Sequence, residues 1–240
     1  DFAAWIRRGC TFRIAASAAF FESPAALPAF QKTYDFKLAR DQIVTFIVAG
    51  HETVASALTW AWSLLADDAE LLARLRAEVE VTSGGDAPGI DDLPRLPFTA
   101  AVLDEVLRLY PPAWLVTRRS LEPDELGGVE VPADALIIVS PWIVHRDERL
   151  WPDPERFDPD RFLDEHGARR RDLVASSAYL PFGAGPRLCI GRDMALLEGI
   201  LVLASLVTKV DLERVEPPPR AVPLVTVRPD HGLPLRLKVR

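Results

Sequence analysis

The longest apolar segment of the chain runs from Leu38 to Asp67 and contains few residues that break a helix. Its apolar residues would lie on nearly every side of a helix, which is typical of a helix buried in a large core or in a membrane. His51 and Glu52 lie inside this segment. Because an acidic side chain near the centre of a bilayer costs about 2.5–3.5 kcal/mol, the pattern predicts a helix of a soluble core and no membrane segment in this chain.

Three shorter helices are predicted where apolar residues repeat at the spacing of one helix face, over residues 68–81, 98–110 and 190–208. Short runs of residues that favour strands lie at 115–116, 129–131 and 136–139, and two more strands are expected after the prolines at 217–219. Residues 151–181 are rich in Pro, Asp and Arg without sustained periodicity, which predicts an irregular coil around the core. The predicted fold class is mainly α with minor β.

The composition indicates a globular protein, since 49% of the 240 residues are hydrophobic and 26% are charged. The formal net charge of -7 argues against a nucleic-acid partner, because phosphate binding needs clustered Lys and Arg. The arginines at 169–171 form a short cluster, which we interpret as a solvated loop. Cys10 and Cys189 lie in dissimilar contexts and indicate no disulfide framework. Since no leader sequence is recognisable, we expect a cytoplasmic location.

The strongest chemical signal is the segment Phe-Gly-Ala-Gly-Pro-Arg-Leu-Cys-Ile-Gly at residues 182–191, just before the last predicted helix. Its glycines let the backbone fold tightly under a flat cofactor and point amide N–H groups at a sulfur atom. Cys189 stands at the start of a helix, whose positive end favours a thiolate ligand. Phe182 would shield the sulfur from water, and Arg187 is placed to reach a carboxylate of the cofactor. The alternative is a buried, inert cysteine in a glycine-rich turn.

A second signal is the segment Ala-Gly-His-Glu-Thr at residues 49–53, in the middle of the long predicted helix. Two small residues let a planar ligand approach the helix backbone. The Thr53 hydroxyl can bond to a preceding carbonyl and widen the helix locally. Taken alone, Glu52 and Thr53 could equally be a solvated or capping pair.

Together these segments resemble the cytochrome P450 family, whose haem-binding signature Phe-Gly-x-Gly-x-Arg-x-Cys-x-Gly is matched at every fixed position by residues 182–191. The resemblance implies a mainly helical fold that binds haem b through the Cys189 thiolate, a ligand that favours O–O cleavage. It also implies that Thr53 stabilises reduced dioxygen while Glu52 relays protons. The implied haem contacts are Cys189, Phe182, Gly183, Arg187, Gly191, Ala49, Gly50 and Arg118.

Residues Glu105 and Arg108 stand three apart on the helix predicted at 98–110, and Asp104 with Arg108 is a competing ordinary pair. Followed by Leu-Tyr-Pro-Pro, this helix resembles the family's Glu-x-x-Arg helix, whose buried ion pair takes a further arginine from the downstream coil. Two arginines are candidates for this third position. Arg156 lies in the tetrapeptide Pro-Glu-Arg-Phe at 154–157, and Arg161 lies in the segment Phe-Asp-Pro-Asp-Arg-Phe at 157–162. We choose Arg161, because an aromatic residue and a spacer precede it as the family's pattern requires.

Several positions stay open at the level of the sequence. Counting back from the glycines at 127–128 favours Arg118 over Arg119 as an arginine that binds a haem propionate, and an exposed strand charge is the alternative. Trp114 and Leu115 would border the substrate pocket, though both could be plain core. The histidines have no second ligand at metal-binding spacing, so no zinc site is assigned.

The resemblance extends from about residue 40 to the carboxyl terminus, and family members are roughly twice as long. We therefore expect residues 36–240 to be the haem-binding carboxyl-terminal part of an incomplete cytochrome P450-like domain. Residues 1–35 are atypical for the family. We hypothesise that they are not native family sequence.

The resemblance implies a monooxygenase that inserts one oxygen atom of O2 into a small organic substrate. Electrons would come from a separate donor, a ferredoxin or a flavoprotein reductase docked near Arg187 and Arg192, because the chain has no nucleotide-binding fingerprint. One alternative is a truncated, non-catalytic remnant that binds haem weakly or not at all. Another is a haem-thiolate enzyme that uses peroxide or rearranges its substrate, against which the Glu52 and Thr53 pair argues.

Overall fold

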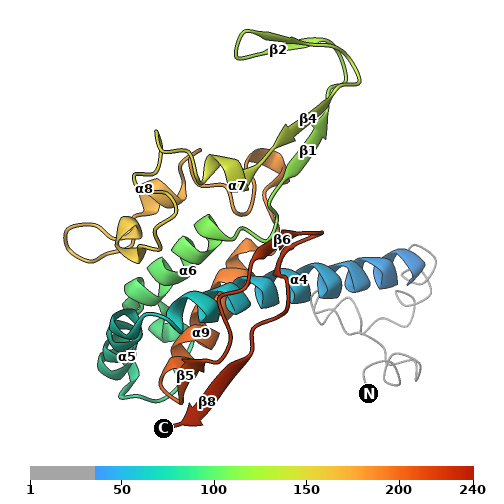
Figure 1. Ribbon diagram of the computed structural model, residues 1–240. Coiled ribbons are helices and arrows are strands. Elements are labelled where there is room, and N and C mark those ends of the chain that lie inside the picture. The colour runs from blue at the N-terminus through green and yellow to red at the C-terminus, as the bar shows by residue number, and fades with distance from the viewer. Residues whose placement is uncertain (1–35) are drawn as a thin grey trace. The chain divides into compact units, whose positions relative to one another are not determined.

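A computed structural model describes residues 36–240 of the chain, with side chains from Leu38 onward. The chain divides into two units, Asp1–Val48 and Ala49–Arg240. The prediction that residues 1–35 are not native family sequence lies outside the described residues. Among residues 36–240, long helices prevail over short strands, which confirms the mainly α fold with minor β (Figure 1).

The predicted long helix is α4 (Phe36–Leu65), and it is continuous. Its second half is buried, with Trp60 only 1% exposed, whereas Phe46 and Val48 in its first half are 56% and 62% exposed. The predicted helix of a soluble core therefore packs against that core only in its second half, where the core cluster begins at Ala57. By length and mean hydropathy (1.3 over Leu38–Leu65), α4 could also span a membrane, a criterion that core helices of soluble proteins meet as well.

The three shorter predicted helices are confirmed to within a few residues as α5 (Ala69–Ser83), α6 (Pro97–Leu109) and α9 (Arg192–Val207). Local chemistry sets their ends. Asp68 caps α5 by accepting the backbone N–H of Leu71, and Gly84 takes a φ of 64° directly after the helix. Pro97 begins α6, where a backbone N–H would have no helical partner.

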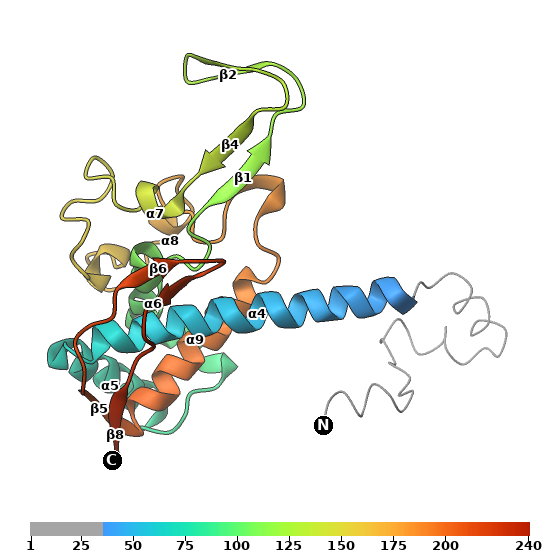
Figure 2. The same cartoon turned by 45° about the vertical axis from the view of Figure 1, so that its right-hand side comes forward.

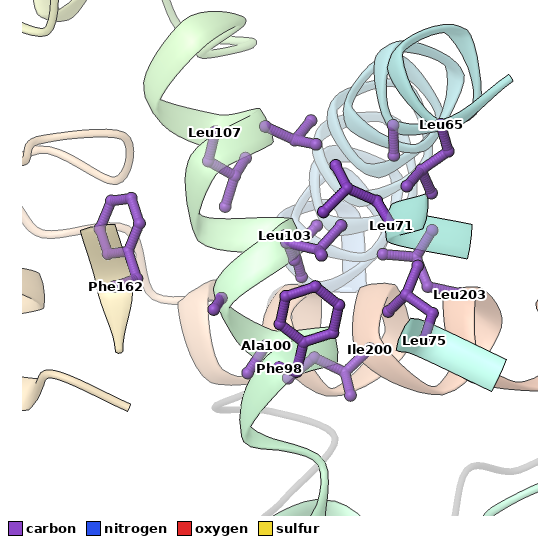
Figure 3. Close-up of a cluster of buried hydrophobic side chains, with 14 of the residues drawn as sticks. Leu65, Leu71, Leu75, Phe98, Ala100, Leu103, Leu107, Phe162, Ile200 and Leu203 are labelled. Carbon is purple, nitrogen blue, oxygen red and sulfur yellow. The ribbon is translucent and has the colours of Figure 1, made fainter. Parts of the chain in front are cut away.

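Helix α6 lies at the centre of the core, and every residue after its first is buried. Leu103 of α6, Leu203 of α9 and Leu75 of α5 belong to one apolar cluster (Figure 3). The close approach of α6 and α9 depends on Gly199, because a Cβ at that position would lie 2.7 Å from a methyl carbon of Leu103. Phe162 covers another side of α6 (Figure 3). Each such side chain contributes about 1.5–3 kcal/mol when fully buried, so α6 is held from several sides.

Among residues 36–240, the strands form four antiparallel pairs: β1 (Val116–Arg119) with β4 (Leu136–Val139), β2 (Asp124–Leu126) with β3 (Val129–Val131), β5 (Val210–Arg214) with β8 (Leu235–Val239), and β6 (Ala221–Pro223) with β7 (Val227–Pro229). The strands predicted near 115–116, 129–131 and 136–139 are thus present. Strands β2 and β5 were not predicted, because both carry several charged residues. Three strands rather than two follow the prolines at 217–219. The β2–β3 hairpin extends beyond the end of the β1–β4 pair (Figures 1 and 2).

The coil predicted at 151–181 holds only two short helical turns, η2 (Pro159–Phe162) and α8 (Arg171–Val174). The remaining short turns are η1 (Ile90–Arg95), α7 (Pro141–Val144) and η3 (Gly185–Arg187). The turn η2 packs against α6. The coil therefore brings its arginines to the face of α6 that carries the acidic residues.

Candidate functional site

The loop at 182–191 is a tight turn that ends at an exposed thiol. Gly183 and Gly185 adopt φ values of 72° and 70°, which residues other than glycine rarely adopt. The N–H of Cys189 donates to the Phe182 carbonyl at 3.0 Å and closes the turn. Cys189 itself is exposed and forms no disulfide. The loop therefore presents a sulfur atom at an open surface.

The surface around Cys189 is apolar and unusually exposed. Ile190 and Met194 are 86% and 72% exposed, and Leu188 is 38% exposed. Exposed apolar side chains that cluster in this way mark a binding face. Arg187 is exposed and forms no ion pair with any residue from 38 to 240.

Gly191 is the N-cap of α9, and a Cβ at that position would lie 3.9 Å from the Cys189 sulfur. The thiol thus stands beside the first turn of α9. Within residues 36–240, His, Cys, Asp and Glu form no cluster of three that could hold a bare metal ion. A metal bound by Cys189 would therefore need a cofactor that brings its own ligands. Haem does so, and the exposed Cys189 thiol, with Arg187 nearby in the loop and without an ion pair among residues 38–240, suits its iron and its carboxylates.

The segment directly before the loop is anchored to α6 by an ion pair whose carboxylate is buried. Arg169 donates two hydrogen bonds to the Asp104 carboxylate, at 2.6 and 2.7 Å, and the Tyr179 hydroxyl donates to the Asp104 carbonyl at 2.9 Å. Burial raises the pKa of Asp104, against the hydrogen bonds from Arg169 and Tyr179, which lower it. The interpretation of the arginines at 169–171 as a solvated loop is wrong for Arg169, because its guanidinium is needed to pair a carboxylate that is 1% exposed.

The Glu105 and Arg108 side chains form the ion pair that their spacing suggested, and both are fully buried. Arg108 Nε and Nη2 donate to the two Glu105 oxygens at 2.6 and 2.8 Å. Asp104 pairs elsewhere, so the competing pair with Arg108 is absent. Arg161 Nε lies 3.4 Å from Glu105 Oε1, whereas Arg156 contributes only its backbone carbonyl, which accepts from Arg108 at 3.2 Å. The geometry therefore brings the Arg161 guanidinium, rather than that of Arg156, to Glu105.

The residues Ala49, Gly50 and Thr53 lie on α4. Thr53 Oγ1 donates to the Ala49 carbonyl at 2.8 Å, as its position suggested. The helix nevertheless stays a regular α-helix there, so the predicted widening does not occur. A Cβ at Gly50 would meet no heavy atom within 4 Å, which leaves its face open. None of the hydrogen bonds found among residues 38–240 joins this segment to the Cys189 loop.

Glu52 points to the carboxyl-terminal hairpin formed by β6 and β7. Its Oε1 accepts a hydrogen bond from Thr226 Oγ1 at 2.7 Å and lies 2.5 Å from Arg228 Nη2. The hydrogen bonds from Arg228 and then Thr226 lower the pKa of Glu52. The carboxylate is therefore held ionised and in a fixed direction.

The two arginines of β1 point to opposite faces, as neighbours on a strand do. Arg119 binds the Asp134 carboxylate at 2.9 Å. Arg118 donates only to the Thr117 carbonyl at 2.9 Å, and among the described residues it has no acidic partner. Of the two, Arg118 is thus the one whose charge is left for a ligand.

Trp114 is half-buried against the core, and its indole N–H donates to the Leu224 carbonyl at 2.8 Å. Leu115 is half-buried next to it. Neither borders the cavity of about 240 Å³ that Phe182, Gly183 and Asp104 help to line. Trp114 and Glu52 instead meet the same carboxyl-terminal hairpin, at Leu224 and at Arg228.

Five residues that bind the side chains or the backbone of the candidate site were not predicted as its partners: Thr226, Arg228, His145, Arg169 and Tyr179. Each contacts a residue at least 35 positions away. Local periodicity carries no information about such contacts. The fully buried state of His145 was likewise invisible, since its neighbours Arg146 and Asp147 are polar.

Comparison with known proteins gives consistent matches. Residues 29–233 match the family model described as cytochrome P450. The chain is 48% identical over 166 residues to cyclooctatin synthase of Streptomyces melanosporofaciens, which covers 69% of this chain and 35% of that protein. It is 44% identical over 169 residues to cyclooctat-9-en-7-ol 5-monooxygenase of the same organism, covering 70% and 36%.

A third relative is pentalenene oxygenase of Streptomyces avermitilis, 41% identical over 202 residues, which covers 83% of this chain and 44% of that protein. The chain thus spans between about a third and a half of the length of the curated relatives that it matches.

Proposed function

The chain belongs to the cytochrome P450 family, and from this premise we propose that Cys189 is the thiolate ligand of haem b in a monooxygenase. The substrate is a small organic molecule, and one oxygen atom of O2 enters it. Two of the relatives are named an oxygenase and a monooxygenase, which supports oxygen insertion. The proposal rests above all on the exposed, unpaired Cys189 thiol at the end of the glycine turn.

When bound, the haem supplies the activation of dioxygen, with two electrons and two protons consumed and one water released per oxygen atom inserted. The chain supplies the environment. With the haem bound, the Phe182 ring would shield the sulfur from water, and Gly183 and Gly191 would let the backbone approach the cofactor closely. Arg187 and Arg118 are exposed cations without acidic partners among the described residues, which suits them to the two haem carboxylates.

On α4, Ala49 and Gly50 would leave room for the flat cofactor, since a Cβ at Gly50 would meet no heavy atom within 4 Å. Thr53 donates its hydroxyl proton to the Ala49 carbonyl, so that its oxygen lone pairs stay free to accept a hydrogen bond. Glu52, whose carboxylate is held by Arg228 and Thr226, is the residue that would relay protons. Trp114 and Leu115 border the substrate.

The electron donor is a separate protein, a ferredoxin or a flavoprotein reductase, that docks near Arg187 and Arg192. The location we propose is cytoplasmic. Glu105, Arg108 and Arg161 do not touch the substrate in this proposal; they hold α6 and the coil together around the haem.

The carbon monoxide difference spectrum of the reduced, haem-loaded chain tests the proposal. The wild-type chain and a Cys10→Ser control are expected to give the Soret band typical of a thiolate-bound haem, and Cys189→Ser is expected to lose it. A thiolate-type band that persists in Cys189→Ser would overturn the assignment of the ligand. Failure of the wild-type chain to take up haem would instead support a truncated, non-catalytic remnant.

A further inference from the structure

His145 is a fully buried histidine that no part of the proposed chemistry uses. It follows α7, and both of its ring nitrogens are engaged. Nδ1 lies 3.0 Å from the Arg108 carbonyl oxygen, at the end of α6. Nε2 lies 2.8 Å from the backbone nitrogen of Leu180, two residues before Phe182. One imidazole thus joins α6 to the segment that enters the Cys189 loop.

The chemistry of the two partners fixes the tautomer of the ring. A carbonyl oxygen can only accept, so Nδ1 carries the proton and donates to Arg108. A backbone N–H can only donate, so Nε2 is unprotonated and accepts from Leu180. Burial lowers the pKa of His145 to about 3, and the ring is therefore neutral at physiological pH, as this pair of bonds requires.

The contact between His145 and α6 is made by two reciprocal hydrogen bonds. Arg108 Nη1 donates to the His145 carbonyl at 2.7 Å, so that Arg108 and His145 each bond the other's backbone. The same Arg108 guanidinium holds the Glu105 carboxylate. The His145 ring also stacks on Tyr179, with centroids 5.5 Å apart. The ring is therefore held from α6 and from the coil at once.

From Leu180 the hydrogen bonds continue into the loop. The Leu180 carbonyl accepts the N–H of Gly183 at 3.1 Å, and the Phe182 carbonyl accepts the N–H of Cys189 at 3.0 Å. Fixing the backbone of Leu180 therefore fixes the start of the turn that carries the thiol.

We propose that His145 is a positioning residue for the haem ligand: its Nε2 anchors the Leu180 amide and thereby sets the direction in which the loop presents the Cys189 sulfur. This inference rests on the proposed function, in which Cys189 binds haem. A purely structural role, in which His145 only fills space and satisfies α6, is the competing explanation.

Two substitutions of His145 each remove one of the two hydrogen bonds of the imidazole and keep the other. His145→Asn places an amide N–H near the position of Nδ1 and keeps the bond to Arg108, but it leaves Leu180 without an acceptor. His145→Gln places an amide oxygen near the position of Nε2 and restores that acceptor. Leu75→Ala, in the core between α5 and α9, is the control that lowers stability without touching the loop.

Two readouts are compared across the four proteins. Amide hydrogen exchange at Leu180 in the haem-free chain is expected to rise roughly tenfold in His145→Asn and to stay near wild type in His145→Gln and Leu75→Ala. The carbon monoxide difference spectrum of the haem-loaded proteins is expected to lose the thiolate-type Soret band in His145→Asn and to keep it in the other three. If the band instead follows overall stability, and Leu75→Ala loses it as much as His145→Asn does, the inference is wrong.

A measurement on the wild-type chain avoids any loss of folding in the variants. Nitrogen–nitrogen scalar coupling across the hydrogen bond should connect the Leu180 amide to His145 Nε2, and its absence would overturn the anchor. The two proposals fail separately. A wild-type chain without the thiolate-type band overturns the proposed function. A wild-type chain with the band, together with a His145→Asn variant that keeps it, overturns only the role of His145.

Discussion

The buried residues around α6 differ sharply from the residues proposed to contact haem. We call the first group the α6 support, and it consists of Asp104, Glu105, Arg108, His145 and Tyr179. We call the second group the haem face, and it consists of Ala49, Gly50, Arg118, Arg187 and Cys189.

Every member of the α6 support is at most 5% exposed, and its charged groups all find partners within the chain. The haem face is exposed, and its arginines and its thiol have no acidic or disulfide partner among residues 38–240. The difference indicates that the support is assembled by the chain's own contacts, whereas the haem face is completed only by a ligand. Substitutions in the support should therefore act on stability, with His145 acting in addition on the direction of the Cys189 sulfur, and substitutions in the haem face should act on haem binding.

The largest effect is expected from Glu105→Gln. It leaves the Arg108 guanidinium buried beside a neutral partner, and breaking a buried ion pair in this way costs about 3–5 kcal/mol in the free energy of unfolding. Urea denaturation of the haem-free chain measures it. The double variant Glu105→Leu with Arg108→Met removes both charges and should cost clearly less. Equal losses in the single and double variants would mean that packing, and not the charge pair, stabilises the support.

A smaller loss is expected from Arg169→Met, which leaves the Asp104 carboxylate without its cation. Hydrogen bonds to charged groups are worth about 1.5–3 kcal/mol, and the free energy of unfolding should fall by that amount near neutral pH. Because burial already raises the pKa of Asp104 above its ordinary value of 3.8, the folded variant holds a proton that the unfolded chain releases. Its stability should therefore decline as pH rises above about 4, and a pH-independent loss would contradict this account.

His145 gives a pH dependence of the opposite sign. Its pKa is lowered from 6.5 to about 3 in the folded chain, so between these values the unfolded chain binds a proton that the folded chain does not. Stability should fall as pH decreases through this window, by at most about 1.4 kcal/mol per pH unit. His145→Gln should remove this component of the urea-denaturation profile, whereas His166→Gln, at an exposed position, should leave it in place.

Arg228→Met is expected to change the free energy of unfolding least of all these variants. Its main effect should be on the pKa of one group, the Glu52 carboxylate. Arg228 is the main cause of the lowered pKa of Glu52, so the substitution should raise that pKa toward its ordinary value. Carbon-13 NMR of the Glu52 carboxylate measures the change. Thr226→Val should raise it less, and Arg220→Met, which removes an exposed cation paired with Asp230, should not change it. An unchanged pKa in Arg228→Met would show that the hairpin does not control Glu52.

The sequence predicted what is encoded locally. The periodicity of apolar residues placed α4, α5, α6 and α9. The resemblance of residues 105–112 to the family's Glu-x-x-Arg helix implied the ion pair of Glu105 and Arg108, which the spacing alone left open. The glycine pattern singled out the Cys189 loop as a turn. In each case the signal and the structure lie within a few consecutive residues.

The remaining features depend on contacts between distant residues. Glu52 meets Arg228 from 176 positions away, and Asp104 meets Arg169 from 65 positions away, so neither pairing appears in any local pattern. The exposed first half of α4 was missed for a related reason. An apolar composition indicates that a helix face can be buried, but the face is buried only where another element packs on it. In α4 the residues of the core cluster begin at Ala57.

Amide hydrogen exchange, measured by mass spectrometry with and without added haem, is the most direct test of the difference between the two groups. It asks whether the α6 support is ordered without haem and whether the haem face becomes ordered only when haem binds. In the wild-type chain, α6 is expected to be protected in both conditions, and residues 182–191 are expected to gain protection only when haem is added. Cys189→Ser should keep the protection of α6 and lose most of the gain in the loop. Protection of α6 that appears only with haem, or a gain in the loop that does not need Cys189, would contradict the account.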